Sequence, residues 1–298
     1  MSWRRIWQAA VFELFSALRS RRAVVVVVLY LVVSLLCMGG TITMLGKLED
    51  QLSQVLQVER PEGAKSGVVS AALWKSKPFQ NIVKGALQGD TLVYDDICGK
   101  HPAELIYAWF VLLLVPPLTL MLSANRAASE IGSGSVLYMI TRVTRLEWTL
   151  GKYLGSALSI LVGVLVGACG AWAVAFFKLS GTDVAALFPA MVGWSLKAWV
   201  LSLAWLGLAL GISHFFKSGA KADGLAWLML LAFSVAPNAL KLFGGRFAFL
   251  SFLFPATAEH SLWRTSFAPV AASSAWLVML GLCYLSAGYA FFAGRDAR

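Results

Sequence analysis

The side chains that could do chemistry are concentrated in one polar stretch, RAASEIGSGSVLYMITRVTRLEWTLGKYLG, at residues 126–155. Its charges, glycines and hydroxyls interrupt a chain that is otherwise mostly apolar. No HExxH or CxxC pattern occurs in the sequence and the three histidines lie far apart in it, so we expect no metal site. No nucleophile is paired with a base in the apolar segments, and we therefore expect no catalytic residue.

The cysteines and the absence of a phosphate loop narrow the chemistry further. Three cysteines lie in apolar runs and only Cys98 lies in a polar segment, so the sequence predicts no disulfide framework. The chain contains no GxxxxGK[ST] sequence. We therefore expect it to bind no ATP through a P-loop of its own and to carry no cofactor.

The composition indicates an integral membrane protein. Of the 298 residues, 59% are hydrophobic and 13% are charged, whereas about a quarter of the residues of a soluble domain are charged. The net charge of +10 would suggest a nucleic-acid partner in a soluble protein. In a membrane protein it is explained by lysines and arginines that set the orientation, so we expect a lipid bilayer and no nucleic acid as the environment.

Six apolar segments are long enough to cross a bilayer core of about 30 Å as helices. The predicted fold is therefore an all-α integral membrane protein with six transmembrane helices. The predicted spans cover residues 23–45, 104–124, 153–177, 191–214, 222–242 and 270–293.

The distribution of basic residues predicts the orientation. Lysines and arginines gather before the first span, in residues 125–152, in the short turn before residue 222 and at the C-terminal end, while the shorter loops on the other side hold few. Basic residues accumulate in short cytoplasmic loops. We therefore expect a multi-pass membrane protein with both termini in the cytoplasm.

Three further segments flank or connect the spans. Residues 1–22 form a basic amphipathic pattern with Trp3 and Trp7, which predicts an interfacial helix. Residues 46–103 are too long and polar for a turn, and we expect a small, mainly helical outer domain that a periplasmic partner could bind. Residues 243–269 are aromatic and broken by glycine and proline, which favours re-entrant or interfacial helices on the outer side.

The polar stretch occupies the cytoplasmic loop at residues 125–152. Residues 127–139 can form a short helix with Glu130 in its first turn, where a carboxylate suits the helix dipole. Gly132 and Gly134 weaken that helix by about 1 kcal/mol each relative to alanine, so they are expected to let the loop backbone approach another group closely. A second short element is expected from Thr144 to Lys152. The alternative is an ordinary solvated loop whose charges only set the orientation.

The order of residues in this loop resembles that of the type-2, exporter-class permeases of ABC transporters. Glu130, a Gly134-Ser135 pair, the sequence TRVTRLE and the sequence GKYLG follow one another as in that family. Arg142 stands where the family usually has proline, and Ser135 where it usually has threonine. The six spans, the amphipathic leader, the broken outer segment and the ending FFAGRDAR extend the resemblance over the chain.

The resemblance implies a function for the loop and a set of partners. The loop would be a coupling helix that docks on a separate cytoplasmic P-loop ATPase, which binds ATP and magnesium. Six spans are half of the family's usual set, so a homodimer or a pairing with a related permease is implied. The implied ATPase-coupling residues are Glu130, Gly132, Gly134, Arg142, Arg145, Glu147 and Lys152.

A few residues within the spans are candidates for the translocation pathway. Lys197 is a basic residue inside a span, and intramembrane charges are costly enough to suggest function. It lies near the outer end, however, and could instead extend outward to the headgroups. Pro116 and Pro117 should kink the second span, either to form a pathway wall or hinge or simply for packing. Gly163 and Gly167 favour close helix contact, within the chain or in a dimer.

Three rivals differ in class from an ATP-driven permease. An ion-coupled secondary carrier needs ionisable groups at mid-membrane and usually repeated halves, and apart from Lys197 the spans carry almost no such groups. A membrane enzyme needs convergent catalytic side chains. A non-transporting scaffold or assembly factor needs neither intramembrane ionisable groups nor catalytic side chains. Stimulation of ATP hydrolysis by a cargo would indicate a transporter and not a scaffold.

Overall fold

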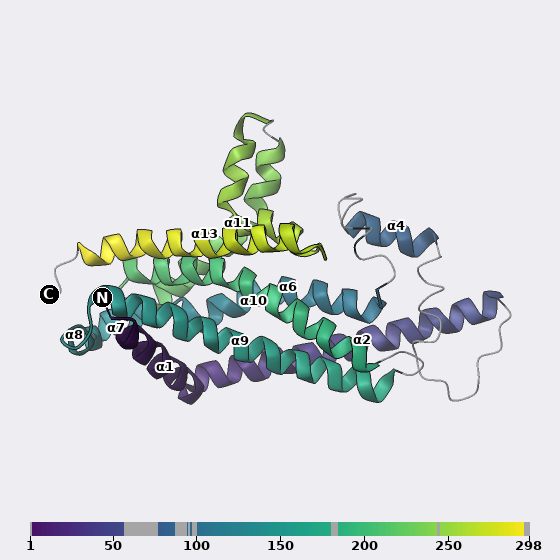
Figure 1. The fold of residues 1–298 in the computed structure, drawn as a ribbon, viewed down its shortest axis with the longest axis horizontal. Helices are drawn as coiled ribbons and strands as arrows, with labels where there is room; N and C mark the ends of the chain where they lie inside the picture. Colours follow the sequence, from purple (N-terminus) through teal and green to yellow (C-terminus); the bar gives the residue numbers. More distant parts are fainter. Residues whose placement is uncertain are drawn as a thin grey trace.

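The computed structural model describes residues 2–56, 77–86, 94, 96, 100–179, 184–242 and 245–294, which fold almost entirely into helices (Figure 1). Six of these helices are long and apolar enough to cross a membrane. The predicted all-α fold with six membrane spans is therefore confirmed. The elements are α1 (Trp3–Arg19), α2 (Arg21–Leu56), α4 (Lys77–Ala86), α6 (Pro102–Ser123), α7 (Arg126–Ser133), α8 (Ser135–Ile140), α9 (Arg145–Lys178), α10 (Val184–Phe215), α11 (Gly219–Leu242), η1 (Gly245–Leu253), α12 (Pro255–Leu262) and α13 (Phe267–Ala293).

The spans form a bundle in which α10 is central and α11 is peripheral. In the most apolar 18-residue stretch of each helix, 78% of α10 is buried, whereas only 11% of α11 is buried. Figure 1 shows both termini and the α7–α8 loop at one end of the bundle and α4 at the other. In the same view the light-green hairpin of α11 and η1 stands out from the side of the bundle.

Helices α10 and α13 pack with their backbones in contact. A Cβ atom added at Gly207 would lie 1.9 Å from the carbonyl oxygen of Gly281, and one added at Gly288 would lie 2.4 Å from that of Gly211. Small residues allow such close approach, which stabilises helix pairs in lipid by van der Waals contact. This contact fixes the last span against the central one.

Helix α1 lies against the start of α9 through a face that includes neither Trp3 nor Trp7. Ile6 and Ala10 are fully buried, whereas Trp3 and Trp7 are exposed and face away from the protein. Gly151 of α9 makes the close crossing possible, because a Cβ atom there would lie 2.5 Å from the Cβ of Ala9. The tryptophans are thus free to contact lipid headgroups.

The glycines of the third span pack within the chain. A Cβ atom at Gly167 would lie 2.4 Å from the ring of Tyr30 in α2, and one at Gly163 would lie 3.6 Å from Val27 in α2. The Gly163–Gly167 spacing could serve packing within the chain or contact in a dimer. In the structure both glycines pack within the chain.

The helix bounds differ from those expected at several places. Residues 145–152 do not form a separate short element as expected. They are the first two turns of the long helix α9, whose N-terminal cap is Thr144. The helix expected at residues 127–139 is divided into α7 and α8 by Gly134, whose φ of 74° ends the first helix. Helix α10 begins at Val184 and continues through Pro189, whereas the span was expected from residue 191.

The outer segment before the last span contains two short helices, η1 and α12. Two carbonyls at the end of η1 accept from side chains of α13, since Trp276 Nε1 donates to the carbonyl of Phe252 at 3.1 Å and the Tyr284 hydroxyl donates to that of Leu253. Irregular backbone needs such partners at membrane depth. Residues 57–76, 87–93, 95 and 97–99 of the expected outer domain, residues 243–244 and the tail 295–298 lie outside the described residues.

Candidate functional site

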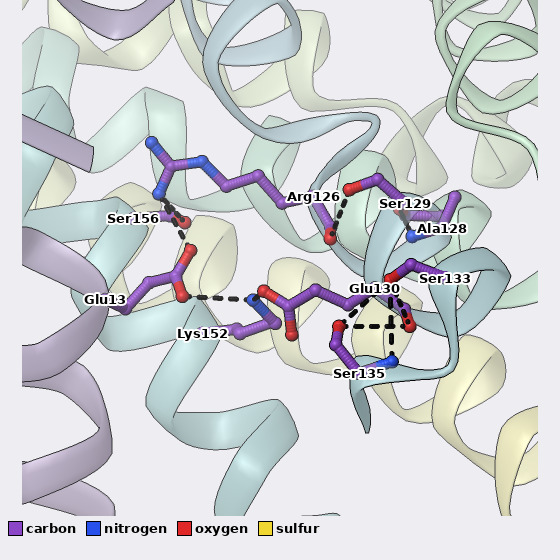
Figure 2. A network of polar contacts seen from close by, with 10 residues as sticks. Glu13, Arg126, Ala128, Ser129, Glu130, Ser133, Ser135, Lys152 and Ser156 are labelled. Atoms are coloured by element: carbon purple, nitrogen blue, oxygen red, sulfur yellow. Dashed lines mark hydrogen bonds and ion pairs between the residues drawn. The ribbon is translucent and has the colours of Figure 1, made fainter. Parts of the chain in front are cut away.

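Four charged side chains from three elements form a network beneath the polar loop (Figure 2). Lys152 of α9 lies at its centre and donates to Glu13 Oε2 of α1 at 3.0 Å and to Glu130 of α7. Arg126, the first residue of α7, donates to the other oxygen of Glu13 at 3.0 Å. The network therefore joins the interfacial helix, the loop and the third span.

The network is buried at its centre and balanced in charge. The side chain of Lys152 is 3% exposed and that of Glu13 is 10% exposed, whereas that of Glu130 is 34% exposed. Burial alone would raise the pKa of Glu13, but Lys152 and Arg126 outweigh it and hold that pKa below its usual range. Two carboxylates and two cations thus compensate each other, as a buried ionic cluster requires.

Glu147 and Arg145 fasten the start of α9 to both ends of the chain. Glu147 forms a capping box with Thr144, and its second oxygen accepts from the backbone N–H of Ser2 at 2.8 Å. Arg145 donates to the carbonyl of Ala293 at 2.9 Å, at the C-terminal end of α13 where a cation is favoured. Four predicted coupling residues, Glu130, Arg145, Glu147 and Lys152, are therefore engaged in contacts within the chain.

The two loop glycines have different physical roles. A Cβ atom at Gly132 would lie 2.0 Å from the carbonyl oxygen of Lys217, in the turn between α10 and α11. The expected close approach of the loop backbone to another group is thus found at Gly132, and that group is the Lys217 carbonyl. Gly134 has no such neighbour within 4 Å, but its positive φ is one that only glycine adopts readily.

Part of the exposed surface of the loop is its tip, formed by α8 and the turn after it. Tyr138 is 81% exposed and Leu137 is 43% exposed, and Thr141 and Arg142 are exposed beside them. Of the predicted coupling residues with charge, only Arg142 belongs to this tip. We define these four residues as the loop tip.

Sequence reasoning missed Tyr138 and Glu13 as site residues. Glu13 follows the buried Ile6 and Ala10 at helical spacing, so its place on the inward face of α1 could have been found from the period alone. Tyr138 sits among apolar neighbours in SVLYMI, and no local signal distinguishes it from a buried aromatic residue.

Comparison with known families identifies the chain. The profile described as ABC-2 family transporter protein matches residues 7–294, which is nearly the whole chain. The chain belongs to this family. It is thus a permease of an ABC transporter, a membrane transport component whose relatives typically pair with an ATPase subunit. No match was found among curated proteins.

The intramembrane lysine of the permease holds the outer segment in place. Lys197 Nζ donates to the carbonyls of Leu262 and Arg264 at 2.8 and 2.9 Å, and lies 4.1 Å from the ring centre of Trp194. A cation is favoured at the C-terminal end of a helix, here α12, and over an aromatic face. Lys197 therefore positions α12 against α10.

The two prolines of the permease lie within a continuous α6. Pro116 is buried in the bundle and Pro117 is half-buried. Near them, the hydroxyl of Thr119 donates to the carbonyl of Val115 at 2.8 Å. A role of this segment as a hinge or pathway wall stays a prediction.

Proposed function

We propose that this permease is the membrane half of an ATP-driven exporter in a bacterial inner membrane. A separate cytoplasmic P-loop ATPase, which binds ATP and magnesium, docks on the loop tip. The observation that carries this proposal is that the loop tip is exposed, while the rest of the loop is bound to the bundle through buried charges. Exposed apolar residues with an adjacent cation are typical of a protein-docking surface.

The base of the loop is suited to transmit a displacement. It contacts α1 and α9 through the Glu13–Lys152–Glu130 network, the α10–α11 turn through Gly132, and α13 through Arg145. Elements that are packed together and joined by charged contacts move together. A solvated loop would instead change its own conformation and would not pass the displacement of the ATPase to the spans. ATP binding then shifts the permease to the extent that its two conformations contact the ATPase differently.

A second permease chain completes the transporter in this proposal, as a homodimer or with a related permease. Helix α11 is the least buried of the six spans and exposes Trp227, Leu228, Leu231 and Val235 along one face. Such a face can contact either lipid or a partner helix. The hairpin that α11 forms with η1 stands out from the bundle (Figure 1) and is our candidate for the contact.

The docking proposal predicts a large loss of ATPase affinity for Tyr138→Ala. An exposed tyrosine at the centre of an interface contributes about 2 kcal/mol, which corresponds to roughly thirtyfold in affinity. The measurement is binding of the ATPase that co-purifies with the full-length permease, with the permease held in nanodiscs. Phe267→Ala is the matched control, because Phe267 is 87% exposed at the N-terminal end of α13, where we expect no effect.

Failure of an ATPase to co-purify, or equal affinity for Tyr138→Ala and the unmodified permease, would contradict docking at the tip. Transport that continues without ATP and follows a proton gradient would instead favour an ion-coupled carrier.

The proposed orientation predicts that the loop faces the cytoplasm. Ser133 is exposed at the end of α7, so a Ser133→Cys variant without the native cysteines should react with a membrane-impermeant maleimide only after the cytoplasmic side is opened. The measurement is labelling of intact and permeabilised cells. A cysteine at Phe267 should react with intact cells. Labelling of Ser133→Cys in intact cells would rule out contact with a cytoplasmic ATPase.

A further inference from the structure

A groove runs between α2 and α9 on the lipid-facing side of the bundle, toward the end opposite the two termini. It has a volume of about 520 Å³, which is within the range of sites for small organic ligands. Its lining residues come from these two helices only: Leu35, Leu36, Gly39, Gly40, Thr43, Met44, Lys47, Val174 and Lys178.

The groove crosses the boundary between hydrocarbon and headgroups. Helix α2 begins at Arg21, and a helix traverses a hydrocarbon core of about 30 Å in roughly 20 residues. The core therefore ends near Thr41. Leu35 and Leu36 lie at the depth of acyl chains, whereas Lys47 lies at the depth of headgroups.

The polar end of the groove carries positive charge. Its lining includes the two lysines, Lys47 and Lys178, and no carboxylate. Both side chains are exposed, and no ion pair to either is found among the described residues. Lys178 Nζ would lie 3.8 Å from a Cβ atom at Gly39, so this ammonium group crosses from α9 toward α2.

The floor of the groove exists because two glycines follow each other in α2. A Cβ atom at Gly40 would meet nothing within 4 Å, so the backbone of α2 is open there. A ligand with an apolar chain can lie along this floor with its charged end between the lysines. Ordinary lipid-facing helices carry side chains in this position.

We propose that this groove binds one anionic phospholipid from the leaflet opposite the termini. One acyl chain lies along Leu35, Leu36 and Val174, and the phosphate lies between Lys47 and Lys178. The site is separate from the loop tip and goes beyond the proposed coupling function. The charge selects an anionic lipid over a zwitterionic one, because each lysine near a membrane surface contributes about fivefold in affinity toward anionic lipid.

The test compares lipid binding to the full-length permease, without any ATPase. The permease is placed in nanodiscs of phosphatidylcholine that contain a small fraction of phosphatidylglycerol, and retained lipids are counted by native mass spectrometry. We expect one retained phosphatidylglycerol per chain. Lys47→Gln and Lys178→Gln should each reduce its retention about fivefold.

A second variant tests the groove independently of charge. Gly40→Leu fills the open floor and replaces glycine by a better helix former, so the fold should be kept while retention is lost. Gly193→Leu is the matched control, because Gly193 of α10 also has no atom within 4 Å of an added Cβ, and it should retain the lipid.

Three outcomes would overturn the proposal. One is equal retention of phosphatidylcholine and phosphatidylglycerol, which indicates ordinary boundary lipid. Another is displacement by soluble glycerol phosphate at similar concentration, which indicates a site for a free anion. The third is efficient cross-linking of Gly40→Cys to a second copy of the chain, which indicates that protein covers the groove.

Discussion

Replacing Lys152 by methionine should destabilise the permease by about 3–5 kcal/mol, the usual cost of leaving a buried charge without its partner. Methionine matches the length of lysine, so little packing volume is lost. The substitution removes the cation that contacts both Glu13 and Glu130. Glu13 would keep only Arg126 as a charged partner. The measurement is thermal unfolding of the purified permease in detergent, followed by tryptophan fluorescence.

The double variant Glu13→Gln/Lys152→Met should recover part of this stability, because it restores the balance of charge in the network: one cation, Arg126, and one carboxylate, Glu130, then remain. Lys221→Met serves as the control, since Lys221 is exposed on α11 and should lose less than about 0.5 kcal/mol. If Lys152→Met and Lys221→Met unfold at the same temperature, the network contributes nothing to the fold.

Replacing Gly132 by valine should cost about 3 kcal/mol, at the upper end of the range for overpacking. The added Cβ would collide with the carbonyl of Lys217, which belongs to the backbone and cannot rotate away. Helix α7 would have to move from the α10–α11 turn, so the loop tip would lose its position. We therefore expect both a lower unfolding temperature and weaker binding of the ATPase.

The control for this prediction is the neighbouring glycine. Gly134→Asn should cost clearly less, because the space around Gly134 is open and asparagine tolerates a positive φ better than other side chains. If Gly132→Val is as stable as Gly134→Asn and binds the ATPase normally, then the contact with Lys217 does not position the loop.

Only part of the loop's structure could be predicted from the sequence. The order of charges and glycines indicated the correct family, and the close approach at Gly132 follows from the presence of glycine in a helix. The partner of each charge did not follow, however. Arg145 bonds to the end of α13, 148 residues further along the chain, and such a pairing has no local signature.

For Lys197, too, the sequence predicted the position in the span but not the bonding partners. Its position near the outer end of a span was evident from the sequence, and so were the two possible explanations for it. The structure adds a third, because the carbonyls at the end of α12 accept its hydrogen bonds. These carbonyls come from a segment 65 and 67 residues away, which only the folded chain brings to the lysine.

The sequence by itself determined the six apolar spans and the polar character of the loop, because both depend on local composition measured against the thickness of a bilayer. The tertiary structure decided which charges of the loop are buried with partners and which residues remain exposed. The physical reason is that the cost of burying a charge is set by neighbours from distant segments. Glu13 and Lys152 are 139 residues apart, and each is compensated in the interior by the other together with Arg126 and Glu130.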